Sequence, residues 1–194
     1  MTPAADPQPA GPELWLVRHG ETEWSRDGRH TSVTDLPLTE KGEAAAAVLR
    51  ERLGGVAFDL VLTSPRQRAR RTAELAGHPE AEPDEDLAEW AYGDYEGVRT
   101  AEIRETVPDW TVWTHPVPGG ESATDVATRL DRVVARAREH RRSLVFAHGH
   151  SLRALTARWI GQPVEEGRNF VLDTSTVSVL GFERETPALL TWNS

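Results

Sequence analysis

Leu14-Trp15-Leu16-Val17 runs directly into Arg18-His19-Gly20-Glu21, and this step from apolar to polar residues decides the fold. A short apolar run of this kind is typical of a buried strand, which here delivers polar side chains at its carboxyl end. The same step recurs twice, where Phe58 to Thr63 precedes Ser64-Pro65 and Ser143 to Ala147 precedes His148-Gly149-His150. The sequence therefore predicts three buried strands that each end in polar residues.

Helices alternate with these strands. Thr39 is a suitable N-cap for a helix over 40–52, and Ser64-Pro65 offers an N-cap and a first-turn proline for a helix ending near Ala76. Ser122 can begin a long amphipathic helix. We also expect helices over 100–106 and 152–160 and strands over 176–182 and 188–192. This alternation predicts an α/β three-layer sandwich, with a mostly parallel central sheet, helices on both faces and ligands at the carboxyl ends of the strands.

Length and composition limit the possible functions. The 194 residues suffice for one domain, and 38% hydrophobic with 27% charged residues is ordinary globular usage. A formal charge of −9 argues against nucleic acid as a partner, and no apolar run is long enough to span a membrane. There is no cysteine, which excludes disulfides and thiol nucleophiles. Residues 1–12 lack the pattern of a secretory signal, so we expect a disordered tail, one domain over 13–194 and a cytoplasmic protein.

The polar residues at the strand ends indicate an anionic ligand. The carboxyl ends of parallel strands share one rim of a sheet, so His19, His148 and the arginines near Arg68 are expected to converge. Arginine binds phosphate oxygens with a planar, permanently charged fork. A histidine can act as a nucleophile when one ring nitrogen is free and the other is held as a donor. Phosphoryl transfer fits this set best.

The chain resembles the histidine phosphatase superfamily, which includes the phosphoglycerate mutases. The resemblance covers nearly all residues from Leu14 to Phe182. Within the superfamily, the sequence is most similar to the fungal sedoheptulose-1,7-bisphosphatase branch and its bacterial phosphatase relatives. The motifs that carry the resemblance are Leu16-Val17-Arg18-His19-Gly20-Glu21-Thr22, Leu38-Thr39-Glu40-Lys41-Gly42, Thr63-Ser64-Pro65 with Arg68-Ala69, Glu89-Trp90-Ala91-Tyr92-Gly93, and Ala147-His148-Gly149-His150.

This resemblance implies roles for five residues. His19 would be the nucleophile that forms a phosphohistidine, with Arg18, Arg68 and His148 binding the phosphoryl group and Glu89 as the proton donor. Glu21 and Glu96 are competing candidates for the proton donor. Because guanidinium and imidazolium groups can supply the positive charge, we expect a metal-free reaction that needs no cofactor.

A second group of residues is expected to bind the rest of the substrate. Many family members have asparagine at the position of Ser25, a phosphate-contact position, and the fungal branch usually has tyrosine at the position of His30. The resemblance places His30, Thr31, Tyr92 and Arg153 on the substrate side of the pocket. His150 is interpreted as a packing residue or as one that supports the catalytic residues, and it is not placed among them.

Three functions remain open from the sequence. The leading hypothesis is a phosphatase that acts on small phosphomonoesters, sugar phosphates foremost. The alternatives are a phosphoglycerate mutase and a noncatalytic module that binds a phospho-ligand. The segment from Val98 to Gly120 is short, whereas the mutases resemble longer chains with extra lid residues there, and an open lid favours hydrolysis because water can reach the phosphoenzyme. The sequence leaves the substrate and the oligomeric state open.

Overall fold

A six-stranded sheet forms the centre of the computed structural model, which describes residues 11–194. The strand order is β3-β2-β4-β1-β5-β6, in which β1 to β4 run parallel and β5 and β6 antiparallel to their neighbours. The strands are β1 (Glu13–Arg18), β2 (Leu60–Thr63), β3 (Glu82–Pro83), β4 (Arg142–Ala147), β5 (Val177–Glu183) and β6 (Thr186–Thr191). The tail predicted over residues 1–12 lies almost entirely outside the described residues.

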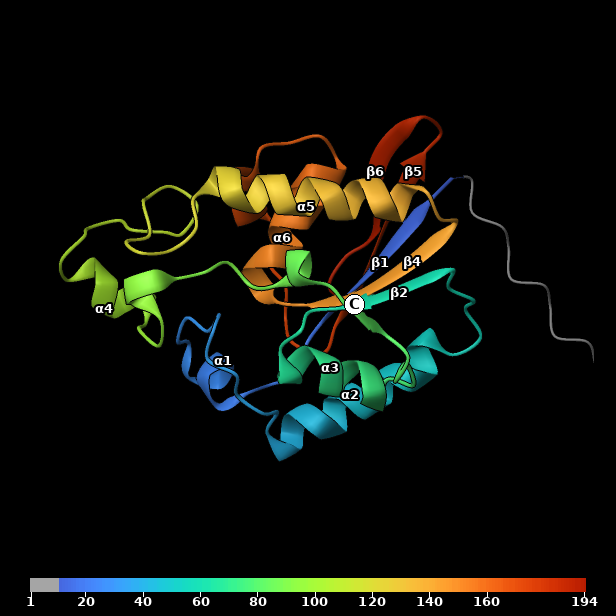
Figure 1. Cartoon of the computed structure of the whole chain (residues 1–194), viewed down its shortest axis with the longest axis horizontal. Coiled ribbons are helices and arrows are strands. Elements are labelled where there is room, and N and C mark those ends of the chain that lie inside the picture. Colours follow the sequence, from blue (N-terminus) through green and yellow to red (C-terminus); the bar gives the residue numbers. More distant parts are fainter. Residues whose placement is uncertain (1–10) are drawn as a thin grey trace, which may run out of the picture.

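Helices cover both faces of this sheet, which confirms the predicted three-layer fold. Helices α2 (Glu40–Leu53) and α3 (Gln67–Leu75) lie on one face, and α5 (Ala123–Arg138) and α6 (Gly149–Trp159) lie on the other (Figure 1). Strand β4 is buried along its whole length because it lies between β2 and β1 and is covered from both sides. The apolar runs identified in the sequence are therefore the interior of the sheet.

The local signals for helix starts are correct in two places and wrong in one. The side-chain oxygens of Thr39 and Ser122 accept hydrogen bonds from Gly42 N and Asp125 N, as expected of N-caps. Ser64, in contrast, is not the cap of α3, which begins at Gln67 after Arg66 and has no side-chain cap. The Ser64 hydroxyl is instead 2.7 Å from His148 Nε2, so this serine belongs to the site rather than to the helix end.

Two short helices, α1 (Glu23–Asp27) and α4 (Thr100–Arg104), lie together at one end of the molecule (Figure 1). The sequence indicated α4 but not α1. The described part of the chain also has three short 3-10 helices, at Glu85–Leu87, Gly93–Tyr95 and Val164–Asn169. None of the helices over residues 11–194 combines the length and the apolar character needed to cross a bilayer.

The turn after β1 packs backbone to backbone against the first turn of α2. A Cβ atom added at Gly20 would lie 2.6 Å from the Gly42 carbonyl oxygen, and one added at Gly42 would lie 2.2 Å from the Glu21 carbonyl oxygen. Both distances are far below a normal contact. Glycine is therefore required at both positions, and the close approach holds the residues that follow β1 against the body of the domain.

Candidate active site

The strand register brings the polar strand ends together. Arg18 pairs with Ala147 across β1 and β4, and His19 N donates to Ala147 O at 3.0 Å. On the other side of β4, Ser64 N donates to Phe146 O at 2.8 Å. The rings of His19 and His148 consequently lie 5.1 Å apart between centroids. The sequence prediction that these residues meet at one rim of the sheet is confirmed.

His19 has a fixed tautomer. Its Nδ1 lies 2.7 Å from the carbonyl oxygen of Gly20, which can only accept, so Nδ1 carries the hydrogen and Nε2 is left with a lone pair. Burial, followed by the positive charges of Arg68 and Arg18, holds the pKa of His19 well below its ordinary value. The side chain is therefore a neutral imidazole at neutral pH, which is the form that can attack an electrophile.

Arg68 and His148 form a buried pair beside this nucleophile, and both are 0% exposed. Arg68 Nε donates to His148 Nδ1 at 3.2 Å, so the hydrogen of the neutral His148 ring is on Nε2 and is donated to Ser64 Oγ. The other nitrogens of Arg68 donate to the carbonyl oxygens of Thr31, Ser32 and Thr34 at 3.0–3.2 Å. Both ring nitrogens of His148 thus have protein partners, and contact with a phosphoryl group would require one of them to be exchanged.

The guanidinium groups are the permanent positive charges of this site. Burial, with Arg68 as the next cause, holds the pKa of His148 well below its ordinary value, as for His19. The cationic charge of the site therefore comes from the guanidinium groups. Arg18 donates from Nη1 to Leu172 O at 2.5 Å, while its buried Nε has no hydrogen-bond partner within residues 11–194.

Glu89 is held by the first turn of α6. Its Oε1 accepts hydrogen bonds from Trp90 N and Ser151 N at 2.9 and 2.7 Å, and its Oε2 accepts one from His150 N at 3.0 Å. The carboxylate is only 7% exposed, and its charge raises the pKa of both Arg18 and Arg68 against the effect of burial. Glu89 is therefore close to both phosphate-binding arginines that the sequence predicted.

The two competing carboxylates, Glu21 and Glu96, are hydrogen-bonded to other parts of the protein. Glu21 accepts from Thr39 Oγ1 and Lys41 Nζ at the start of α2. Glu96 accepts from Ser32 N and from Thr34 N, and so orders the loop that also contacts Arg68. Glu89, in contrast, is bonded to the turn that follows His148, and its charge acts on Arg18 and Arg68, so this geometry favours Glu89.

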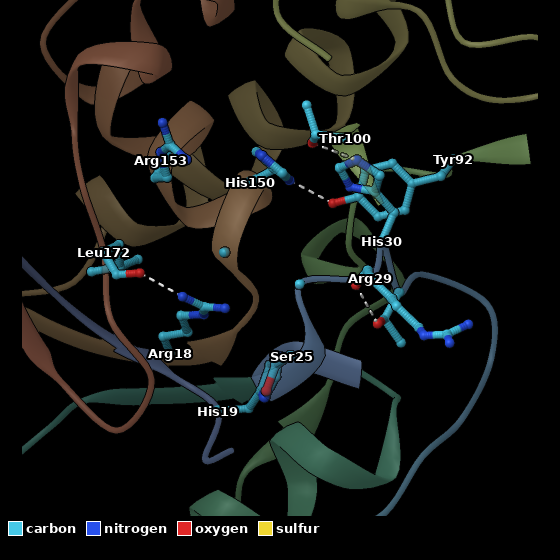
Figure 2. A pocket seen from close by; sticks show the side chains of 13 residues that line it. Arg18, His19, Ser25, Arg29, His30, Tyr92, Thr100, His150, Arg153 and Leu172 are labelled. Atoms are coloured by element: carbon cyan, nitrogen blue, oxygen red, sulfur yellow. Dashed lines mark hydrogen bonds between the residues drawn. The ribbon is translucent and has the colours of Figure 1, made fainter. Parts of the chain in front are cut away.

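A cavity of about 250 Å³ opens beside His19. Arg18, His19 and Ser25 lie at one end of it, and His30, Tyr92, Thr100, His150 and Arg153 lie at the other (Figure 2). Thirteen residues line it, namely Arg18, His19, Ser25, Gly28, Arg29, His30, Thr31, Tyr92, Thr100, Gly149, His150, Arg153 and Leu172. The five residues predicted to bind substrate are all in this wall, whereas Arg68, Glu89 and His148 lie behind it.

The predicted substrate-binding residues differ in how many of their polar atoms already have hydrogen-bond partners in the protein. Ser25 Oγ accepts from Thr22 N and donates to Thr22 O, so this hydroxyl closes the capping box of α1 rather than pointing free into the cavity. Thr31 Oγ1 donates to Arg29 O. Arg153 lies over the ring of Trp113 and donates from Nε to Gly167 O and from Nη2 to Arg168 O, while its Nη1 has no hydrogen-bond partner among the described residues.

Rings make up the wall farthest from His19. The His30 ring lies 4.6 Å from Tyr92 and 5.3 Å from Trp110 between centroids, and its Nε2 is 3.2 Å from Thr100 Oγ1. Burial lowers the pKa of His30 to about 4. The structure adds His150 to this wall, although the sequence analysis interpreted it as a packing or supporting residue. Its place next to His148 in Ala147-His148-Gly149-His150 is the only signal in the sequence that could have indicated it.

Comparison with known proteins assigns the family. A family model for the histidine phosphatase superfamily (branch 1) matches residues 14–194. The chain belongs to the histidine phosphatase superfamily. Among relatives of this histidine phosphatase, the acid phosphatase of Mycobacterium tuberculosis is 46% identical over 175 residues, which cover 88% of this chain and 86% of the relative. The sedoheptulose 1,7-bisphosphatase of Saccharomyces cerevisiae is 37% identical over 189 residues, covering 80% of this chain and 70% of the relative.

Solved structures agree with this assignment. The structure of an open reading frame from Mycobacterium tuberculosis superimposes with a TM-score of 0.89 and 42% identity, and the match covers 93% of this chain and 96% of that one. The family resemblance and the fold expected from it are both confirmed. With phosphatases among its relatives, this histidine phosphatase is a phosphoric monoester hydrolase.

Proposed function

We propose that this histidine phosphatase hydrolyses small phosphomonoesters, sugar phosphates foremost, through a phosphohistidine on His19 and without a metal ion. The observation that carries the proposal is the fixed tautomer of His19: the Gly20 carbonyl oxygen takes the Nδ1 hydrogen, and Nε2 keeps its lone pair beside the cavity that Arg18 also lines. A neutral imidazole held in this way is prepared for attack on phosphorus.

Two steps complete the reaction. In the first, His19 Nε2 forms a bond to phosphorus as the bond to the ester oxygen breaks, and Glu89 acts as the general acid that delivers a proton to the departing alkoxide. In the second, water attacks the phosphohistidine, Glu89 takes a proton from that water, and the N–P bond breaks to release inorganic phosphate. Arg18 neutralises the charge on the equatorial oxygens in both steps, with Arg68 contributing from behind the cavity wall.

The cavity and one relative support the substrate class. A volume of about 250 Å³ suits a small molecule, and the wall beyond His19 offers hydroxyl, imidazole and guanidinium groups rather than an apolar surface. The relative from Saccharomyces cerevisiae is a sedoheptulose 1,7-bisphosphatase, which favours a sugar phosphate. The short segment from Val98 to Gly120 supports hydrolysis over phosphoryl return, because little of the chain is available to exclude water.

Phosphate release over a panel of phosphorylated metabolites, followed by rapid quenching with a ³²P-labelled substrate, tests this proposal. We expect a protein-bound label that survives base, is lost in acid and is absent in His19→Ala. Activity should persist after exhaustive chelation and should be inhibited by vanadate. An acid-stable label would exclude the phosphohistidine, and recovery of a chelated enzyme by added magnesium would exclude the metal-free mechanism. Return of the label to a second phosphoglycerate, instead of to water, would assign the chain as a mutase.

A further inference from the structure

His150 differs from His148, its neighbour in the same turn, in how its ring is used. Both ring nitrogens of His148 have protein partners. The His150 ring lines the cavity, between Arg153 and Tyr92 in Figure 2, and only its Nδ1 has a partner within residues 11–194. The second ring nitrogen of His150 is therefore free to bond a molecule in the cavity.

The partner of His150 fixes its tautomer. Tyr92 Oη is 2.5 Å from His150 Nδ1, and within the part of the chain that the structure describes the Tyr92 hydroxyl has no second hydrogen-bond acceptor. A buried phenol keeps its hydrogen bonded, so Tyr92 donates to Nδ1 and the hydrogen of the imidazole is on Nε2. Burial also raises the pKa of Tyr92 well above its ordinary value and holds that of His150 well below, which keeps both groups neutral.

The neighbouring rings keep this donor in place. Trp113 lies 5.2 Å and His30 6.0 Å from the His150 ring between centroids, and the His150 backbone nitrogen is bonded to Glu89 Oε2. The imidazole is thus held from its backbone, from Nδ1 and from two aromatic faces. What remains is one oriented N–H group in the cavity wall, opposite the end that holds His19 (Figure 2).

We propose that His150, oriented by Tyr92, is a specificity-determining residue that donates a hydrogen bond from Nε2 to a neutral oxygen, a hydroxyl or carbonyl, on the carbon chain of the substrate. A neutral imidazole suits an uncharged oxygen, because an anion at this end is already served by Arg153. The inference rests on the proposed phosphatase function and refines it: the preferred phosphomonoesters are those of polyhydroxylated alcohols.

A pair of substrates with the same carbon skeleton tests this inference. Ribitol 5-phosphate and n-pentyl phosphate are both primary alkyl esters, and only the former carries hydroxyl groups. We expect the wild-type protein to prefer ribitol 5-phosphate in kcat/KM. The two substrates differ in their leaving groups, but this difference is the same for every variant. A change between variants in the ratio of the two kcat/KM values therefore reports recognition of the substrate's hydroxyl groups.

Two substitutions distinguish the Nε2 donor of His150 from the hydrogen bond between Tyr92 and Nδ1. In His150→Asn the side-chain oxygen can still accept from Tyr92, but the donor at the Nε2 position is lost. In His150→Gln the amide can replace the Nε2 donor, but the hydrogen bond to Tyr92 is lost. We expect His150→Asn to reduce the preference for ribitol 5-phosphate about tenfold, the worth of one hydrogen bond in a desolvated site, and His150→Gln to reduce it less. His140→Gln, in the turn between α5 and β4, is the matched control.

The tautomer can be measured without any substitution. Long-range ¹H–¹⁵N spectra of the wild-type protein at neutral pH should show His150 with a bare Nδ1 and a protonated Nε2, and Tyr92→Phe should mix the tautomers. A protonated Nδ1 in the wild-type protein would overturn the inference, as would equal losses on both substrates in His150→Asn. If the protein hydrolysed both substrates without preference, the role of His150 would be overturned but the proposed phosphatase function would stand. If it hydrolysed neither substrate, the role of His150 and the proposed function would both be overturned.

Discussion

The two ends of the cavity are built in different ways. At the chemical end, Arg18 and His19 line the cavity, with Arg68, Glu89 and His148 behind its wall. Each of these side chains has at least one bond to a backbone group or to another member of the same end. At the substrate end, which comprises His30, Thr31, Tyr92, His150 and Arg153, the side chains mostly contact one another or nearby rings. The chemical end is held largely by backbone groups, and the substrate end largely by contacts between side chains.

Because the two ends are held in different ways, some properties of the enzyme can vary independently of others. Backbone groups cannot be replaced by substitution, so the positions of His19 and Glu89 depend on the fold itself. The ring contacts of the substrate end depend only on side chains from segments far apart in sequence, such as Tyr92 and His150. We therefore expect changes at the chemical end to slow all substrates, and changes at the substrate end to alter the choice among them.

The largest effect is expected at Glu89, and it depends on the leaving group. Glu89→Gln should slow phosphoenzyme formation from a sugar phosphate about 10²–10⁴-fold, but that from p-nitrophenyl phosphate much less, because nitrophenolate departs without a proton. Single-turnover quench experiments are the appropriate measurement, since they isolate this step. Glu21→Gln is the control, as Glu21 is bonded to Thr39 and Lys41. Equal losses on both substrates would give Glu89 a positioning role.

Arg68→Lys should have the next largest effect, and the effect should be the same for every substrate. Lysine keeps the charge but cannot contact His148 Nδ1 and three carbonyl oxygens together, so we expect kcat/KM to fall about 10²–10³-fold. Steady-state kinetics with a sugar phosphate and with p-nitrophenyl phosphate measure it. Arg70→Lys, exposed on the same helix, is the matched control. A loss confined to one substrate would place Arg68 at the substrate end.

The substrate end should also affect stability at acid pH. The pKa of His30 is lowered from 6.5 to about 4 by burial, so between these values the unfolded chain binds a proton that the folded protein does not. Stability from this group is complete above pH 6.5 and is lost as the pH falls towards 4. The free energy of unfolding should therefore fall by about 2 kcal/mol from this residue between pH 7 and pH 5.

Urea titrations at the two pH values measure this loss. We expect His30→Phe to be less sensitive to acid than the wild-type protein, and His140→Gln to behave like the wild type. His19, His148 and His150 have pKa values lowered in the same direction, so part of the sensitivity should remain in His30→Phe. If the free energy of unfolding of His30→Phe depended on pH as strongly as that of the wild type, His30 would be taking up protons in the folded protein.

The smallest effect is expected for Ser25→Ala, at the border between the two ends. Because Ser25 Oγ completes the capping box with Thr22, the substitution should lower stability by about 1 kcal/mol. Its loss of kcat/KM should be well below that of Arg68→Lys. Thermal unfolding and p-nitrophenyl phosphate hydrolysis measure the two quantities. A loss of activity as large as that of Arg68→Lys would instead support the phosphate contact that the sequence predicted for Ser25.

The fold and the chemical end could be predicted because their signals are local. A buried strand requires a continuous apolar run, and the polar residues that follow it must lie at the rim of a parallel sheet. His19, Ser64 and His148 could thus be placed together before any coordinates were known. The caps at Thr39 and Ser122 depend only on the next three residues, and both were predictable for the same reason.

The errors have a common physical cause, which is competition from distant partners. Ser64 has the sequence of an N-cap, but its hydroxyl is bonded to His148, 84 residues away. His150 has no neighbour in sequence that explains its orientation, because Tyr92 lies 58 residues before it. Helix α1 is five residues long and closed by an unusual Thr22–Ser25 capping box, so it has no periodicity to detect.

The contact between Gly20 and Gly42 limits how this protein can be engineered for heat resistance. A glycine inside the first turn of α2 would be an obvious candidate for replacement by alanine, which favours a helix by about 1 kcal/mol. Here the added methyl group would collide with the Glu21 carbonyl oxygen at 2.2 Å, only two residues from the nucleophile. A more thermostable α2 obtained in this way would displace His19, so thermostability should be sought elsewhere in the helix, at exposed positions such as Val48.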